Sequence, residues 1–103
     1  MISNQNEKVV LPWGYYIKIE DDILSNYKIT KIVLYPKKKQ SLQMQSNCCK
    51  SLLIIKGTPC VFVENLYYFL NPTDNIYIGK NEKHKIENYT KKNVELIETQ
   101  IFN

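Results

Sequence analysis

The chain contains no arginine, so lysine supplies all 14 of its Lys and Arg residues. Arginine normally makes the bidentate contacts by which proteins hold nucleic-acid bases and phosphates. The net charge of +4, from 14 Lys against 10 Asp and Glu, therefore suits a small anionic ligand at least as well as a nucleic acid. We expect no nucleic-acid partner.

Cysteine is scarce and shows no useful spacing. Cys48, Cys49 and Cys60 are odd in number, two of them are adjacent, and no Cys-x-x-Cys pair is present. This pattern excludes a disulfide framework and a zinc-finger spacing. A reducing cytoplasm is the expected compartment. Adjacent Cys48 and Cys49 do not by themselves indicate a metal site or a reactive thiol.

Long apolar runs are also missing. The longest aliphatic run covers residues 52–55, which is too short to span a bilayer. The first ten residues are polar and have no signal-peptide core. We therefore expect neither a membrane partner nor a secretory leader.

The residues that are present predict one globular β domain. A length of 103 residues, of which 44% are hydrophobic, can build one core without a disulfide or a structural metal. We predict a single domain over residues 1–103, with an ordered core at about residues 9–102. Eight tyrosines and many Ile and Val residues favour strands.

Alternating apolar residues and turn residues divide the chain into short strands. The stretch 27–35 alternates best, and both of its faces become apolar toward its end, which predicts a central strand. Asn71 to Asp74 form a clear turn, and we expect 45–50 to be a loop before a buried strand. The predicted strands cover residues 15–20, 27–35, 41–44, 51–56, 60–64, 66–70, 76–78, 84–88 and 94–101.

No stretch predicts a helix of ten residues. Short strands that recur about every ten residues, with turns between them, are typical of an antiparallel sandwich or barrel. Periodicity alone leaves a jelly roll, an immunoglobulin-like sandwich and an OB barrel open.

Several motifs choose among these folds. From Leu11 to Gln100 the chain resembles the small cupin domain of type II mannose-6-phosphate isomerases, which is also fused to mannose-1-phosphate guanylyltransferases. The resemblance implies an all-β cupin fold, a double-stranded β-helix or jelly roll. The matching pieces, in order, are PWG at 12–14, Lys31-Ile32 leading into Pro36, SLQM at 41–44, Gly57-Thr58, Tyr77-Ile78, His84 with Asn88, and ELIETQ at 95–100.

The same resemblance places the family's metal ligands on Gln43, Gln45, Lys50 and His84. The family has Gln, His, Glu and His at these positions, so two of the four are substituted here. A catalytic divalent site needs about three protein ligands and an open position. We therefore expect a degenerate site with His84, Gln43 and Gln45 as candidate metal ligands, and either no cofactor or a weakly bound Zn, Mn or Co ion.

His84 is the candidate catalytic residue, as a surviving ligand or base; it could equally be a packed strand histidine. Lys50 could place its ammonium where the metal would lie. The resemblance also implies basic residues near the barrel opening at Lys31, Lys39 and Lys85, which could hold a phosphate or be solvated. Glu95 and Glu98 stand three apart on one strand, so at most one points inward.

Three functions remain open. The leading hypothesis is a standalone, metal-poor relative of the isomerase domain, which binds a sugar phosphate or nucleotide sugar in polysaccharide metabolism with little turnover. The first alternative is an active isomerase that interconverts mannose 6-phosphate and fructose 6-phosphate. The second is a non-catalytic dimerisation module. A homodimer and a nucleotidyltransferase are the candidate protein partners.

Overall fold

The computed structural model describes residues 7–22 and 24–103. The strands of this part are β1 (Lys8–Leu11), β2 (Gly14–Asp22), β3 (Tyr27–Leu34), β4 (Cys48–Lys56), β5 (Cys60–Val63), β6 (Leu66–Phe69), β7 (Asn75–Ile78), β8 (His84–Glu87) and β9 (Val94–Phe102). No helix occurs among these described residues. The prediction of an all-β chain is confirmed.

The absence of helices has one consequence for membranes. Within residues 7–22 and 24–103, no helix is long and apolar enough to cross a bilayer.

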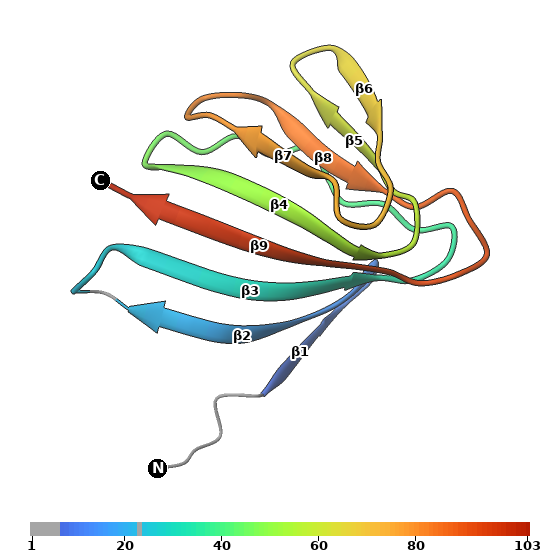
Figure 1. The fold of residues 1–103 in the computed structure, drawn as a ribbon, viewed down its shortest axis with the longest axis horizontal. Helices are drawn as coiled ribbons and strands as arrows, with labels where there is room; N and C mark the ends of the chain where they lie inside the picture. Colours follow the sequence, from blue (N-terminus) through green and yellow to red (C-terminus); the bar gives the residue numbers. More distant parts are fainter. Residues whose placement is uncertain (1–6, 23) are drawn as a thin grey trace.

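The strands form two antiparallel sheets (Figure 1). The six-stranded sheet has the order β1-β2-β3-β9-β4-β7, and the three-stranded sheet has the order β6-β5-β8. The predicted strand at residues 27–35 is central, because β3 pairs with β2 on one side and with β9 on the other. Strands distant in sequence are thus neighbours, as in a jelly roll.

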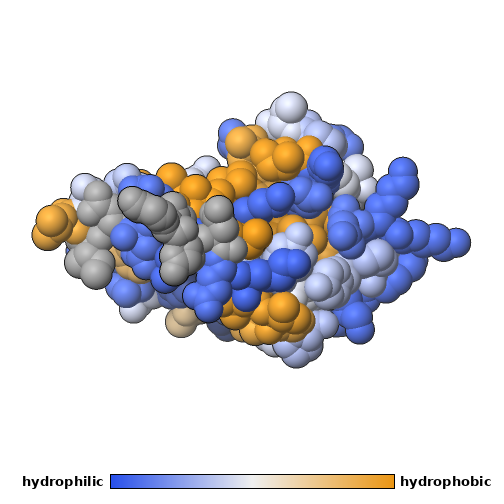
Figure 2. All heavy atoms as spheres, turned by 90° about the horizontal axis from the view of Figure 1, so that it is seen from below, coloured by the Kyte–Doolittle hydropathy of each residue, from blue (hydrophilic) through white to orange (hydrophobic). Residues whose placement is uncertain are grey.

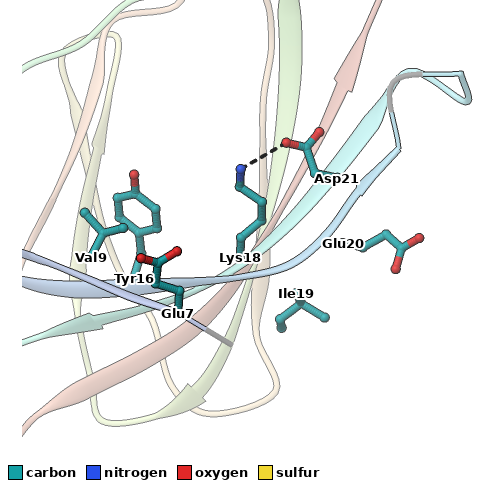
Figure 3. Close-up of a pocket in the computed structure, with 7 residues that line it drawn as sticks. All are labelled: Glu7, Val9, Tyr16, Lys18, Ile19, Glu20 and Asp21. Carbon is teal, nitrogen blue, oxygen red and sulfur yellow. Dashed lines mark ion pairs between the residues drawn. The ribbon is translucent and has the colours of Figure 1, made fainter. Parts of the chain in front are cut away.

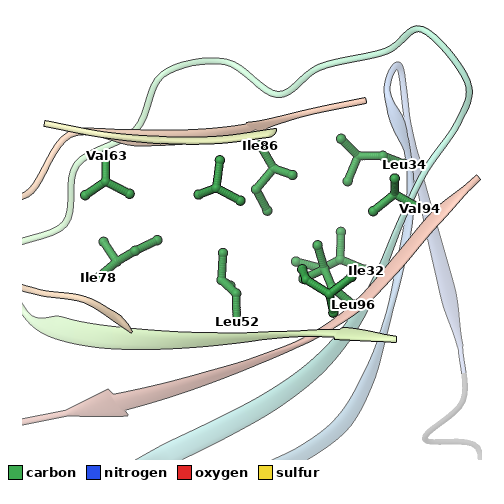
Figure 4. Close-up of a cluster of buried hydrophobic side chains, with 10 residues drawn as sticks. Ile32, Leu34, Leu52, Val63, Ile78, Ile86, Val94 and Leu96 are labelled. Atoms are coloured by element: carbon green, nitrogen blue, oxygen red, sulfur yellow. The ribbon is translucent and has the colours of Figure 1, made fainter. Parts of the chain in front are cut away.

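Two-residue turns join two pairs of neighbouring strands. β5 and β6 form a hairpin whose turn residues Glu64 and Asn65 both have positive φ angles, as the right-handed strand twist favours. A second two-residue hairpin, with a different turn geometry, joins β1 to β2, because Leu11 pairs with Gly14 across Pro12 and Trp13; the predicted strands do not include β1. The hydrophobic core fills the space between the two sheets (Figure 4). Its buried members are Ile32, Leu34, Leu52, Ile54, Val61, Val63, Ile78, Ile86, Val94 and Leu96.

The first half of β4 corrects the prediction of a loop at residues 45–50. The strand already begins at Cys48, which pairs with Phe102 of β9. The prediction failed because the residues that β4 turns inward here are polar or small, so they have no apolar alternation. The rest of β4 is buried on one face only: Leu52 and Ile54 lie in the core, whereas Leu53 and Ile55 are 39% and 42% exposed.

Exposed lysines gather at one end of the molecule. The loop with Lys37, Lys38 and Lys39 lies beside the turn at residues 89–93, because Lys37 donates from its backbone N–H to the Thr90 carbonyl over 3.2 Å. Lys91 and Lys92 are also exposed. This end carries the hydrophilic side chains at the right of Figure 2. The three consecutive lysines thus lie in an exposed charged turn.

Candidate functional site

The site arises from a change of polarity along the inner face of the six-stranded sheet. In β3, Ile32 and Leu34 belong to the core, but Lys28 and Thr30 on the same face do not. The residues that pair with them in β9 change from apolar to polar at the same point: Leu96 pairs with Ile32, whereas Glu98 pairs with Thr30. The inner face is therefore apolar at one end of the sheet and polar at the other.

β4 continues this division. Lys50 pairs with Gln100 of β9, and Leu52 pairs with Glu98. The polar ends of β3, β4 and β9 enclose a cavity of about 310 Å³, near the lower end of the range for small-molecule sites. The cavity is lined by Leu11, Trp13, Tyr16, Lys18, Lys28, Thr30, Ile32, Gln40, Gln43, Gln45, Lys50, Glu98 and Gln100.

Gln43, Gln45 and Lys50, three of the residues predicted for the site, lie together on this lining. The Lys50 side chain is only 5% exposed and forms an ion pair with Glu98, with 3.2 Å between Nζ and Oε2. Its ammonium also donates to Gln43 Oε1 over 3.2 Å. The Gln43 amide in turn donates to Gln40 Oε1 over 3.2 Å. A charged and hydrogen-bonded network thus holds the polar end in place.

His84 lies in β8, on the opposite sheet. Its ring faces the interior, because Ile86 two residues later is a core residue. Its backbone is bridged to that of Gln43, with 2.9 Å in both hydrogen bonds. The residue is 3% exposed and does not belong to the cavity lining. His84 is therefore next to the network but behind the surface that a ligand would touch.

The two ring nitrogens of His84 differ in their contacts. Nδ1 lies 2.9 Å from the Glu82 carbonyl and must donate, since a carbonyl only accepts. Nε2 is buried and has no hydrogen-bond partner among the described residues. Burial lowers the pKa of His84 below its usual range, although the bond to Glu82 opposes this shift; the charge of Lys50 lowers the pKa further. The neutral ring thus turns an unused lone pair inward.

The residues at this site do not fit a divalent metal. No group of three His, Cys, Asp or Glu residues within 7–22 and 24–103 is arranged to hold one. The ammonium of Lys50 already bonds the Gln43 and Glu98 oxygens, and a cation beside it would be repelled. We therefore derive no chemical step through a metal.

Lys31, Lys39 and Lys85 do not line the cavity. Lys31 pairs at 3.2 Å with Glu95 on the outer face of the sheet. Lys85 pairs with Glu87 at 3.0 Å, and the backbone of Lys39 is bridged to that of Glu87. Lys31 and Lys85 thus direct their charges to the outer faces of their sheets, and a role for these three lysines in holding a phosphate stays a prediction.

Glu87 explains the grouping of Lys39 and Lys85. Its carboxylate is nearly buried on the outer face of β8 and also accepts a hydrogen bond from the Tyr89 hydroxyl. Burial acts to raise the pKa of Glu87, but the bonds from Tyr89 and Lys85 outweigh it and leave the pKa lowered. The same carboxylate raises the pKa of Tyr89 to about 12. This network lies on the outer face of β8 and is separate from the cavity.

Asn88, the partner of His84 in the predicted motif, has a structural position. Its buried side-chain amide lies 3.2, 3.1 and 2.8 Å from the carbonyls of Leu34, Tyr35 and Lys92. Its Oδ1 accepts from the Thr90 hydroxyl over 2.7 Å. Asn88 therefore fixes the turn after β8 against the end of β3, rather than facing a ligand.

The positions of the two β9 glutamates, the cysteines and Trp13 complete the comparison with the sequence. Of the two glutamates of β9, Glu98 faces the cavity and Glu95 faces outward, so the prediction that at most one points inward is confirmed. All three cysteines are free thiols. Cys48 is buried beside the network, where it contacts Gln45 Oε1 at 3.2 Å. Trp13 packs against the core.

A second hollow, of about 510 Å³, follows β1 and β2 (Figure 3). Its lining includes the exposed carboxylates Glu7 and Glu20, and its only lysine is Lys18, which pairs with Asp21 at 3.2 Å. This hollow offers an anionic ligand no unpaired charge. We therefore place the candidate site in the smaller cavity.

Sequence reasoning missed most of the cavity lining, since Gln43, Gln45 and Lys50 are the only lining residues among the predicted site residues. The residues of the lining that it does not identify include Lys28, Thr30, Gln40 and Gln100. It also does not decide which of Glu95 and Glu98 points inward. The signal was available in the alternation of β3 and β9, where inner positions change from apolar to polar halfway along each strand. Reading the two strands in register would have found Thr30 opposite Glu98.

Comparisons with known proteins agree with this architecture. Residues 2–103 match the family model described as "Mannose-6-phosphate isomerase C-terminal". A putative mannose-1-phosphate guanylyltransferase of Vibrio cholerae is 35% identical over 89 residues, which cover 86% of this chain and 19% of that protein. The xanthan biosynthesis protein XanB of Xanthomonas campestris is 30% identical over 95 residues, which cover 92% of this chain and 20% of that protein.

Among solved structures, the cupin domain of Schizosaccharomyces pombe Cnp3 superposes with a TM-score of 0.81 at 13% identity, covering 86% of this chain and 64% of that one. At this identity the likeness shows the fold alone. The chain spans about a fifth of the length of the curated relatives that it matches. With its family model matched over nearly its whole length, the chain belongs to the mannose-6-phosphate isomerase C-terminal domain family and has the all-β cupin fold.

Proposed function

We propose that this domain binds a phosphorylated sugar or a nucleotide sugar in the cavity between β3, β4 and β9, with little turnover. The observation that carries the proposal is the polar lining itself. It combines side-chain amides, three lysines and one carboxylate with the rings of Trp13 and Tyr16. Amide side chains both donate and accept hydrogen bonds, as sugar hydroxyls require.

The charges suggest how such a ligand would lie. The charge of Lys50 is balanced by Glu98, so this pair suits a neutral diol, with one hydroxyl accepting from the ammonium and another donating to the carboxylate. Lys28 on the same inner face has no carboxylate partner within 4.0 Å in the described chain; its ammonium lies 6.0 Å from the centre of the Phe102 ring. We place the sugar ring at Lys50 and the phosphate at Lys28.

Low turnover follows from the same geometry. Isomerisation of a sugar needs a polarised carbonyl and a base that reaches the substrate. The residues do not fit a divalent metal, and His84, the one histidine, lies behind the cavity lining. Either deficiency alone normally lowers a rate by orders of magnitude.

Amide NMR shifts on addition of mannose 6-phosphate, GDP-mannose, mannose or inorganic phosphate test the proposal. We expect mannose 6-phosphate to shift amides of β3, β4 and β9, and to bind more tightly than mannose or phosphate alone. Lys50→Met should weaken binding at least about tenfold. Lys56→Met is the matched control, because Lys56 is a largely exposed lysine of the same strand.

If no sugar phosphate shifts any amide, the proposal is wrong and a ligand-free dimerisation module takes its place. If Lys50→Met and Lys56→Met weaken binding equally, the ligand binds outside the cavity.

The second candidate is an active mannose-6-phosphate isomerase. The observation that favours it is Nε2 of His84, which has no hydrogen-bond partner in the part of the chain that the structure describes and could accept a proton if the ligand displaced the network in front of it. Production of fructose 6-phosphate by the purified protein, lost in His84→Ala, would place this candidate first.

The relatives suggest a cellular setting. They are named for guanylyl transfer to mannose 1-phosphate and for xanthan biosynthesis. We place this domain in polysaccharide precursor synthesis in the cytoplasm, beside a nucleotidyltransferase in the same or a separate polypeptide. Co-purification with such an enzyme, and the oligomeric state from light scattering, test these partners.

A further inference from the structure

We infer that Lys50 is a built-in cation, whose ammonium fills a cage of side chains that would bind a divalent metal ion in its absence. This step goes beyond ligand binding in the cavity and does not depend on it. It assigns a role to the buried lone pair of His84, which the proposed function leaves unused.

The cage is assembled from four separate segments. β4 supplies Lys50 and β9 supplies Glu98, from strands that are neighbours in the six-stranded sheet. The segment before β4 supplies Gln43, which is bridged to His84 of the opposite sheet. The oxygens of Gln43 and Glu98 each lie 3.2 Å from Lys50 Nζ, and the imidazole of His84 feels the charge of that ammonium.

The groups around Lys50 have the chemistry of metal ligands. A carboxylate oxygen, an amide oxygen and a neutral imidazole nitrogen are all donors that Zn²⁺, Co²⁺ or Mn²⁺ accepts. Here, the two oxygen ligands bond the ammonium, and His84 Nε2 remains buried without a partner among residues 7–22 and 24–103. A buried imidazole nitrogen without a partner is rare in folded proteins, and a cage built around a smaller, directly bound cation would use it.

One N–H donor of the Lys50 ammonium is not used by the cage and is available to the cavity. Two of its three N–H donors have partners in Gln43 and Glu98. The third is available to an oxygen of a molecule in the cavity, because Lys50 belongs to the lining. Lys50 thus presents a positive charge to a ligand oxygen without any need for a metal, and the site should be insensitive to chelators.

Replacing Lys50 by a residue that can bind a metal ion tests the inference. Lys50→Glu removes the ammonium and adds a carboxylate, so that Glu98, Gln43 and His84 gain a fourth donor around one position. After a soak with Zn²⁺, Co²⁺ or Mn²⁺ and desalting, elemental analysis of this variant should find about one ion per chain. The wild type should retain close to none. The Co²⁺ form should show the visible absorption of a tetrahedral or five-coordinate site.

Matched variants separate a real site from added charge. Lys28→Glu makes the same charge change on the cavity lining away from the cage, and should retain no ion. Adding His84→Ala to Lys50→Glu should lower metal affinity at least about tenfold. If Lys50→Glu is folded by circular dichroism and takes up no metal, or if His84→Ala leaves its metal affinity unchanged, the inference is overturned.

Two carboxylates close together could prevent Lys50→Glu from folding without metal. Lys50→Gln then serves as the second variant, since it removes the ammonium and adds only an amide oxygen. Its melting temperature should rise with Zn²⁺ or Co²⁺, whereas that of the wild type should not. A wild type that itself binds one ion tightly would also overturn the inference. None of these readouts uses a sugar, so their failure is distinct from failure of the proposed function.

Discussion

At the scale of single residues, the surroundings of His84 lower its pKa and so favour its neutral form. It is the one histidine of the chain, its Nδ1–H donates to the Glu82 carbonyl, and its Nε2 has no partner among the described residues. A proton added at Nε2 would be buried beside the ammonium of Lys50, and Glu98 and Glu82 only partly oppose this effect. The fold therefore favours the neutral ring.

This state predicts how stability depends on pH. The pKa of His84 is lowered in the folded protein from its ordinary value of 6.5, so below about pH 6.5 the unfolded chain binds more protons than the folded one. Stability should therefore fall as the pH drops through this value and level off below the folded pKa. Urea unfolding at intervals from pH 8 to pH 5 measures the slope.

His84→Gln supplies the comparison, since glutamine does not titrate. Its free energy of unfolding should vary less with pH above pH 5, where carboxylates contribute little. Equal slopes for the wild type and His84→Gln would show that the ring is not held neutral by the fold.

At the scale of strands and turns, much of the architecture is predictable from the sequence. The alternation at residues 27–35 gives β3, and turn residues locate the hairpin at Asn65. The lining of the cavity is harder to predict, because a strand that turns polar groups toward a cavity loses the apolar alternation that identifies it. The beginning of β4 was missed for this reason.

The face of a strand on which a lysine side chain lies is also hard to predict from the sequence. In β8, His84 and Ile86 face the interior, yet Glu87 is also nearly buried on the other face by Lys85 and Tyr89. Period-two patterning identifies the two faces of a strand but does not say which one faces the cavity when both carry buried groups. The resemblance implies a place near the barrel opening for Lys85, whereas its ammonium pairs with Glu87 on the face of β8 opposite to His84.

The PWG motif has an explanation at the level of strand pairing. Gly14 begins β2 and pairs with Leu34 of β3, and a Cβ atom added there would lie 1.9 Å from the Val33 carbonyl oxygen. That oxygen belongs to the backbone, so the two strands would have to separate. Gly14→Ala should therefore destabilise the fold by at least about 1–3 kcal/mol.

Gly79→Ala is the control for this prediction. A Cβ atom at Gly79 would meet side chains and no backbone, namely the Glu82 carboxylate at 3.3 Å and the Tyr77 ring at 3.7 Å, and should change stability by no more than about 0.5 kcal/mol. Unfolding by urea measures both variants. Similar losses at the two positions would mean that the close contact at Gly14 does not limit the pairing of β2 with β3.

At the scale of the whole molecule, the interior is divided into an apolar end and a polar end. At one end the two sheets enclose the apolar cluster in Figure 4. At the other end the same strands of the six-stranded sheet enclose charged and amide side chains. Burying an ion pair there costs desolvation that the attraction of the charges offsets only in part. Stability of the fold alone therefore does not explain the polar end of the interior.

The ion pair of Lys50 and Glu98 makes this division measurable. Glu98→Gln should destabilise the protein by up to about 3–5 kcal/mol, because it leaves a buried ammonium without its counter-charge. Glu95→Gln on the outer face of the same strand should cost no more than about 1 kcal/mol, since its partners Lys31 and Lys56 are far more exposed than Lys50.

The double variant Lys50→Met with Glu98→Leu should recover most of the loss, because it fills the polar end with apolar side chains and leaves no charge behind. The same double variant should no longer bind a sugar phosphate in the NMR titration. If its destabilisation instead equals or exceeds that of Glu98→Gln, the pair contributes to the stability of the fold and the polar end is not a cost borne for binding.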